Sequence, residues 1–334
     1  MSAPLPYFHA LTFCGVLSES KRIINAHSRH FLALSVFFLL PLSFSLIIYP
    51  TLHDALYHPG SISFYTSKFL VSDPTRKYTD GDARFFILPL VYVLFVFLTH
   101  LFAVSTVSYS TFHGFYGRPV KLISSFKSLL YSFLPMISTV IVSKLILCSI
   151  VVLFGLVWFF ILKGLELLGV EVDYDSNYFY SVVILYAVVV GYVLLSLHVN
   201  WILAPVTAVV ESRWGYGPLR RSSDLVKGMK GVALSILLFF NLLIVFLVAS
   251  CSTFLLQVGV TGGRWSWAVI LQMVISSSLA TVLMLQSIAA IVVLFMYCKA
   301  LHGELPFEIA EGFAGDYVSL PFDEEKLPYV VYVA

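Results

Sequence analysis

Six long apolar runs constrain this chain more than any other feature of its sequence. Each reaches about 20 residues, the length that an α-helix needs to cross a bilayer core about 30 Å thick. The runs are apolar on all sides and do not alternate with polar residues, which predicts helices rather than barrel strands. We therefore predict an all-α, polytopic membrane protein with one six-helix transmembrane domain over residues 1–300. The predicted spans are 31–49, 85–107, 136–162, 178–204, 232–257 and 267–297.

The distribution of positive charge predicts how these spans are oriented. Of the twenty Lys and Arg residues, thirteen fall in the N-terminal segment, the loops after the second and fourth spans, and the tail. Only six fall in the loops on the opposite side. Because Lys and Arg accumulate on the cytoplasmic side of a membrane, both termini are predicted to be cytoplasmic. The sequence leaves open whether the membrane is an endomembrane or the plasma membrane, and no segment has the pattern of a cleavable signal peptide.

A basic amphipathic segment follows the fourth span. A helix over residues 219–233 places Leu225 and Met229 on one side and the charged residues on the other. Segments with the same pattern begin near Gly15 and Gly117, and each leads into an odd-numbered span. We predict three interfacial amphipathic helices on the cytoplasmic side, each followed by a transmembrane hairpin, in three pseudo-repeated units of about 100 residues.

The basic side chains of these segments form a candidate lipid-facing basic collar. The alternative is that the segments are only the ends of long helices, whose Lys and Arg reach toward head groups. The eight collar residues are Lys21, Arg22, Lys121, Lys127, Arg220, Arg221, Lys227 and Lys230.

Two stretches resemble known families of membrane proteins. The segment Trp201–Leu237, "WILAPVTAVVESRWGYGPLRRSSDLVKGMKGVALSIL", resembles one in the membrane domain associated with bacterial glycerophosphodiester phosphodiesterases. The N-terminal "ESKRIINAHSRHFLALSVFFLLPLSF" looks more like a plant family of uncharacterised six-span proteins, which shares the loop motif. The two stretches cover about a fifth of the chain. The resemblance implies a six-span topology and carries no catalytic residues. The residues that match the loop motif are Pro205, Glu211, Gly217, Leu219, Arg220, Arg221, Ser222, Leu225, Lys227 and Gly228.

The sequence contains no recognisable catalytic or metal-binding motif. It has no zincin-type histidine pair, no Cys-x-x-Cys, no phosphate loop and no Gly-x-Ser-x-Gly, and the predicted spans contain no Asp or Glu. We therefore expect a non-enzymatic protein with no cofactor, no metal site and no nucleic-acid partner.

Polar residues inside the predicted spans give a second candidate site. Lys144 is the only formal charge there, and it either reaches the head groups or faces the bundle interior. His198 and Asn200 lie near the end of the fourth span. Just beyond that span, Glu211 and Arg213 are predicted to form an ion pair that fixes the turn.

The predicted function follows from the basic collar. We expect the protein to engage anionic lipid head groups, a protein partner, or both. The acidic tail, residues 301–334, is the predicted docking segment for a protein partner. The alternative is a small-solute transporter or channel, with Lys144, His198 and Asn200 along its path.

Overall fold

A computed structural model describes residues 12–57, 83–117, 122–169, 176–260 and 267–304. The described residues form helices and no strands, so the predicted all-α class is confirmed. The chain runs through α1 (Phe13–Ala26), α2 (Ser28–Leu34), the π-helical turn η1 (Ser35–Leu39), α3 (Leu40–Tyr57), α5 (Ala83–Phe115), α6 (Leu122–Leu167), α7 (Asn177–Asn200), α8 (Ala204–Val210), α9 (Tyr216–Leu225), α10 (Lys230–Val260) and α11 (Trp267–Leu301).

Six segments in the described part of the chain are long and apolar enough to cross a membrane, which confirms the predicted number. Each overlaps one predicted span, and most extend beyond its bounds. These segments are Ser28–Leu52, Pro89–Phe115, Leu122–Leu167, Asn177–Val210, Lys230–Val258 and Trp267–Leu301.

The first of these segments is not a regular α-helix throughout, because η1 interrupts it. Pro41 lies just beyond η1 and has no N–H to donate to the turn before it. A wider π-helical turn accommodates such a residue without breaking the helix. The Ser35 hydroxyl also donates to the carbonyl of Phe31 at 2.8 Å.

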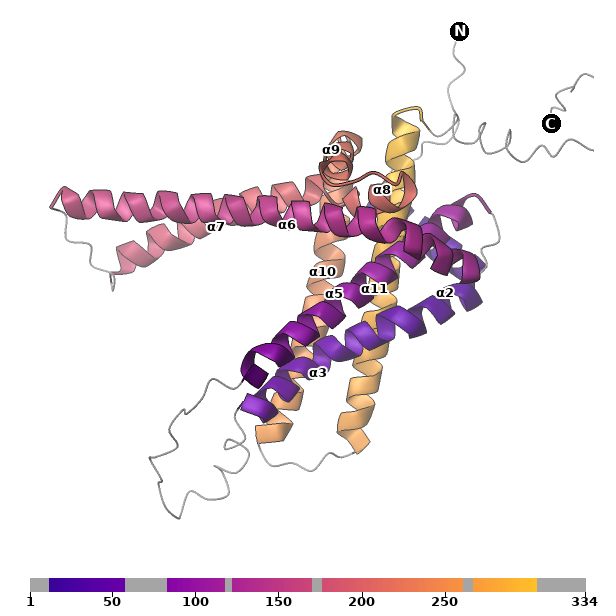
Figure 1. The fold of residues 1–334 in the computed structure, drawn as a ribbon, viewed down its shortest axis with the longest axis horizontal. Coiled ribbons are helices and arrows are strands. Elements are labelled where there is room, and N and C mark those ends of the chain that lie inside the picture. The colour runs from indigo at the N-terminus through magenta and orange to yellow at the C-terminus, as the bar shows by residue number, and fades with distance from the viewer. Residues whose placement is uncertain (1–11, 58–82, 118–121, 170–175, 261–266, 305–334) are drawn as a thin grey trace, which may run out of the picture.

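The core of the molecule is built around α11, which contacts α1, α3, α5 and α10. Small side chains such as Ala289 and Ala290 are buried there and let neighbouring helices approach closely. Hydroxyl groups link the helices as well, since Ser43 on α3 and Thr281 on α11 lie 2.8 Å apart. In Figure 1, α10 and α11 run along one direction while α3 and α5 cross them obliquely.

The helices α6 and α7 form an arm that projects sideways from the other four long helices (Figure 1). The Tyr186 hydroxyl donates to the Phe154 carbonyl at 2.5 Å, and the rings of Trp158 and Tyr186 lie 4.7 Å apart. No residue is buried in the most apolar window of α6, whereas more than half of that window in α11 is buried. The arrangement thus differs from a single bundle in which all six spans pack equally.

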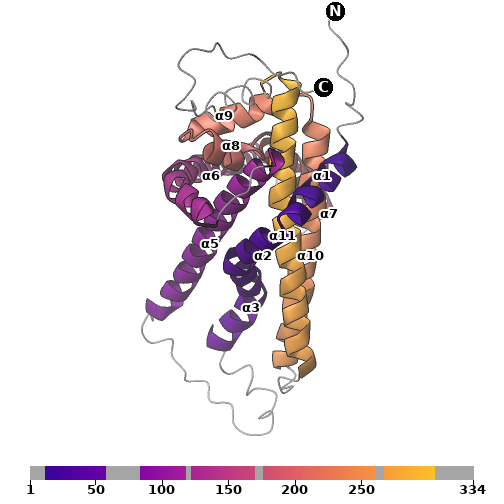
Figure 2. The same cartoon turned by 90° about the vertical axis from the view of Figure 1, so that its right-hand side faces the viewer.

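Two of the three predicted amphipathic segments are separate helices. They are α1 and α9, and Figure 2 shows α8, α9 and the C-terminal end of α11 at one end of the molecule. The helix predicted over 219–233 is not continuous, because α9 ends at Leu225, residues 226–229 form a turn, and α10 begins at Lys230. The second segment is instead continuous with α6, which begins at Leu122 and runs for 46 residues. Its first turns therefore belong to the third span.

Candidate functional site

The basic segment after the fourth span folds back against that span. α8 and α9 are joined by a short turn, and hydroxyl groups hold the two helices together. The Ser222 hydroxyl on α9 donates to the Asn200 carbonyl at 2.7 Å and accepts from the Leu203 amide at 3.1 Å. These two bonds satisfy the Asn200 carbonyl at the end of α7 and the Leu203 amide just before α8. They fix α9 across the end of the bundle.

The apolar side of α9 packs on the protein itself. Leu219, Leu225 and Val226 are almost fully buried, and Leu225 and Val226 belong to the same core cluster as Leu203 on the α7–α8 link and Phe295 on α11. We had predicted that this segment lies in the membrane interface as an amphipathic helix. The structure shows that its apolar face is covered by the bundle, so its charged face alone remains for an external partner.

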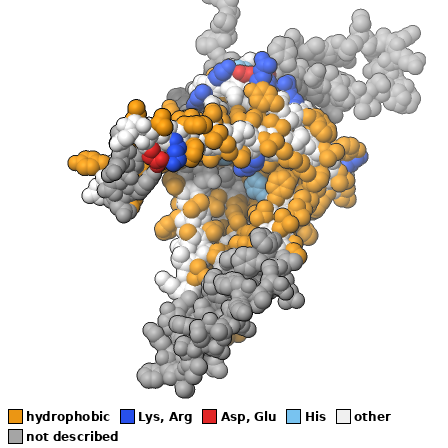
Figure 3. All heavy atoms as spheres, turned by 60° about the vertical axis from the view of Figure 1, so that its left-hand side comes forward, with side chains coloured by type: hydrophobic (Ala, Val, Ile, Leu, Met, Phe, Trp, Pro, Cys, Tyr) orange, Lys and Arg blue, Asp and Glu red, His pale blue; other side chains and the backbone are white. Residues whose placement is uncertain are grey.

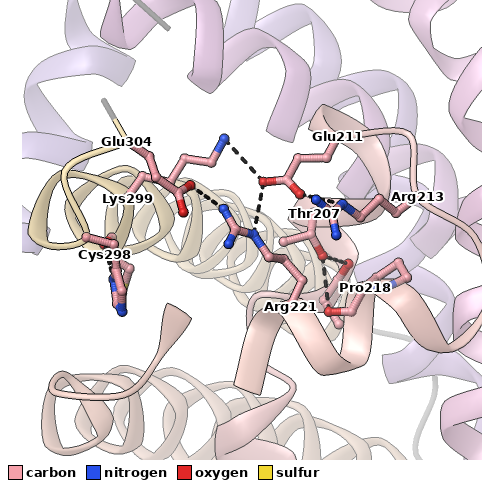
Figure 4. Close-up of polar contacts among 10 residues, drawn as sticks. Thr207, Glu211, Arg213, Pro218, Arg221, Cys298, Lys299 and Glu304 are labelled. Atoms are coloured by element: carbon pink, nitrogen blue, oxygen red, sulfur yellow. Dashed lines mark hydrogen bonds and ion pairs between the residues drawn. The ribbon is translucent and has the colours of Figure 1, made fainter. Parts of the chain in front are cut away.

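An ion cluster lies beneath α9, where the turn after α8 meets the end of α11 (Figure 4). Glu211 is at its centre. One carboxylate oxygen is 3.2 Å from Lys299 Nζ and 3.5 Å from Arg221 Nε, and the other is 2.9 Å from Arg213 Nε. The predicted Glu211–Arg213 ion pair is therefore present. Arg221 also donates to Glu304, just after α11.

Burial makes this cluster different from the surface ion pairs of the protein. The side chain of Lys299 is 3% exposed and that of Glu211 is 13% exposed. The ammonium of Lys299 also lies 4.9 Å from the centre of the Phe295 ring, a cation–π contact. A charge this far from water needs its partners, so the cluster fixes the turn after α8, α9 and the end of α11 relative to one another.

Arg221 departs from the lipid-facing position predicted for it. Its side chain is mostly covered and lies between two carboxylates. Burial alone lowers the pKa of the Arg221 guanidinium, but the hydrogen bond to Glu304 and the charges of Glu211 and Glu304 outweigh burial and raise that pKa. Arg221 therefore serves the ion cluster rather than the outer surface.

The other collar residues of this segment point outward. Arg220, Lys227 and Lys230 are exposed. Lys227 donates to Asp224 at 2.7 Å, and this contact lowers the pKa of the Asp224 carboxyl. Both partners are open to solvent, so water screens the pair and it adds little stability. On the face shown in Figure 3, Lys and Arg side chains gather along the upper rim above a mostly hydrophobic surface.

The first amphipathic segment has the same organisation as α9. On α1, Val16, Ser20 and Ile23 are buried while Lys21 and Arg22 are exposed. The amide of Gln286 on α11 donates to the Ser20 hydroxyl at 2.7 Å. Thus α1 also turns its charges away from the bundle, on a helix that packs against α11.

The second segment is oriented the other way. Ser125 is fully buried, and its hydroxyl lies 3.1 Å from that of Ser110 on α5. The apolar residues Ile123 and Leu130 are instead exposed, and so is Lys127. Lys121 lies outside the described residues.

Sequence comparison adds one finding. Residues 3–327 match the family described as Domain of unknown function (DUF8558). The chain belongs to this family. No curated protein and no solved structure matches it.

The structure places the predicted intramembrane polar residues of this DUF8558 chain on different helices. Lys144 lies on α6 and His198 on α7, and both side chains are exposed. The carbonyl of Asn200 accepts a bond from Ser222 at the α7–α9 junction, so the backbone of Asn200 serves that junction.

Sequence reasoning missed two members of the ion cluster of the DUF8558 chain. They are Lys299, in the last turn of α11, and Glu304, just after that helix. A lysine in the last turn of a long apolar helix is costly unless it is paired, which is the signal that could have found it.

The rest of the tail, residues 305–334, lies outside the described residues. No group of three or more His, Cys, Asp or Glu side chains that could hold a metal occurs in the described part.

Proposed function

We propose that this protein is a multi-pass, non-enzymatic membrane protein whose basic end engages anionic lipid head groups on the cytoplasmic side. The six long apolar helices fit a multi-pass protein, and the charge distribution favours cytoplasmic termini. The resemblance to uncharacterised six-span plant proteins and to a phosphodiesterase-associated membrane domain supports the topology and adds no activity.

The observation that carries the proposal is the excess of positive charge at one end of the molecule. α1, the first turns of α6, the α8–α10 segment and the end of α11 with Glu304 contribute nine Lys and Arg residues against four Asp and Glu residues. Arg213, Arg221 and Lys299 are bound in the ion cluster, and the other six are exposed. Because the apolar faces of α1 and α9 are already covered, the remaining interaction of these helices with a membrane is electrostatic.

The outward-facing collar supplies enough energy for stable lipid retention. A Lys or Arg near an anionic leaflet contributes about 1 kcal/mol. Removing the charges of Arg220, Lys227 and Lys230 should therefore cost about 3 kcal/mol, or roughly a hundredfold in lipid affinity. The effect should weaken as salt screens the charges.

The test compares anionic lipids that remain bound after purification from nanodiscs of mixed phosphatidylserine and phosphatidylcholine. We expect Arg220→Gln/Lys227→Gln/Lys230→Gln to retain far less phosphatidylserine than the wild type at low salt. Lys163→Gln is the control, because Lys163 is a similarly exposed lysine that pairs with Glu166 at the far end of α6. If all three proteins retain equal phosphatidylserine and have unchanged unfolding temperatures, the collar does not bind lipid. Its charges would then only set the orientation of the spans.

A protein partner is the second part of the proposal. Glu304 ties the start of the acidic tail to Arg221, so whatever binds residues 305–334 is held next to the collar. This placement fits a partner recruited to the same membrane surface.

A transporter for a small anionic solute is the competing function, and one observation favours it. Lys144 is a formal charge within the long apolar segment Leu122–Leu167, where an unneeded charge is costly. Lys144→Gln should then abolish chloride or phosphate flux into proteoliposomes, whereas Lys163→Gln leaves it unchanged. Wild-type protein that carries neither anion faster than empty liposomes would eliminate this candidate.

A further inference from the structure

A groove that carries several polar side chains opens between α5, the first turns of α6 and the end of α8. Its volume is about 430 Å³. We propose that this groove binds the phosphate of an anionic lipid, with Lys127 as the cation that neutralises it. The inference rests on the proposed function and gives it a defined site, in addition to the diffuse charge of the collar.

The groove carries the donors that a phosphate needs. Lys127, Ser124 and Ser128 line it from α6, where residues three and four positions apart lie on one side of the helix. His113 and Tyr109 line it from α5, and His113 Nδ1 donates to the Tyr109 carbonyl at 3.0 Å. A lysine with several hydroxyl donors suits a phosphate because the phosphate offers only acceptors.

Negative charge is kept away from this groove. None of the described residues that line it is an Asp or a Glu. The nearest acidic residue in the sequence is Glu211, between the lining residues Val210 and Ser212. Its carboxylate is engaged by Lys299, and Arg213 and Arg221 complete the cluster.

The turn that closes one side of the groove has an unusual backbone. Ser212 has a φ of 49°, and it is the only residue other than glycine with a positive φ in the described part of the chain. A conformation of this kind is disfavoured for a residue with a Cβ and persists only where the surroundings hold it. Here Glu211 holds it, because its ion pairs fix the residue immediately before Ser212.

The surroundings of the groove favour a lipid over a water-soluble phosphate. Ile123 and Leu130 on α6 are 81% and 75% exposed, as expected of side chains that face acyl chains. Trp214, in the turn after Ser212, and Tyr216, the first residue of α9, are exposed as well. Exposed Trp and Tyr are typical of the head-group level of a membrane. A lipid phosphate at Lys127 therefore has apolar surface beside it for its chains.

The test titrates phosphatidic acid into detergent-solubilised protein and measures its binding by thermophoresis. We expect Lys127→Gln to weaken binding at least about tenfold, because it removes a charge-assisted contact. Ser124→Ala/Ser128→Ala should weaken it less, and Lys163→Gln should bind as the wild type does. Soluble glycerol 1-phosphate should bind far more weakly than the lipid. Thermal unfolding of each variant shows that the fold is retained.

The same titration on Arg220→Gln/Lys227→Gln/Lys230→Gln separates this inference from the proposed function. If Lys127→Gln binds phosphatidic acid like the wild type, the groove is not the binding site. This holds even if the triple variant loses lipid binding and the proposed function is supported. Loss of binding in Lys127→Gln but not in the triple variant supports the groove and contradicts a lipid-binding role for Arg220, Lys227 and Lys230. If glycerol 1-phosphate binds as tightly as phosphatidic acid, the ligand of the groove is not specifically a lipid.

Discussion

Replacing Glu211 with glutamine is expected to destabilise the protein by about 3 kcal/mol, the lower end of what breaking a buried ion pair costs. The ammonium of Lys299 would lose the carboxylate that it contacts at 3.2 Å, in a site where its side chain is 3% exposed. Arg221 keeps Glu304, which limits the loss. We expect this effect in thermal or SDS unfolding of the purified protein, read by circular dichroism.

A second variant separates the lost charge from other effects of the substitution. Glu211→Gln/Lys299→Met removes both buried charges and should recover most of the stability, because no unpaired ammonium remains. Asp224→Asn breaks an exposed pair and should cost far less stability than Glu211→Gln, because water screens that pair. If Glu211→Gln is no more destabilising than Asp224→Asn, the ion cluster does not hold the helix ends together.

Replacing Phe295 with alanine is expected to cost about 3–5 kcal/mol, as for other fully buried phenylalanines. Phe295 is 0% exposed and lies in the core cluster that contains the apolar side of α9. Its ring also contacts the ammonium of Lys299. The substitution therefore leaves a cavity at the centre of the bundle and removes one of the contacts that stabilise a buried charge.

Phe246→Ala is the matched control for this prediction. Phe246 lies on α10, and its side chain is 73% exposed on the outer face of the bundle. Both variants remove the same atoms, so the difference between their unfolding free energies measures burial within the protein. Equal destabilisation by the two variants would contradict the packing around α11.

The helices could be predicted from sequence because local information determines them. Length and uniform hydrophobicity define the six spans, and the 3.6-residue period marks α1 and α9. The Glu211–Arg213 pair was also predictable, since the two residues are neighbours along the chain.

The direction of each amphipathic face could not be read from one sequence. The pattern of Leu225 and Val226 is equally suited to a membrane interface and to the surface of a bundle, because both offer an apolar partner. The same ambiguity applies to the segment before the third span, where Ser125 is buried and Ile123 is exposed. Long-range pairs such as Glu211 with Lys299 depend on how the helices pack.

The most direct measurement asks which way α9 faces in a membrane. In a protein with Cys14 and Cys148, the two exposed cysteines, changed to serine, a single new cysteine is placed on α9 at Leu225 or at Arg220. Arg220→Cys should react rapidly with a water-soluble maleimide added from one side of a vesicle, whereas Leu225→Cys should react only after unfolding. A bimane at Leu225→Cys that is quenched by brominated lipids would contradict the packing of α9 on the bundle. It would place the apolar side of α9 in the membrane instead.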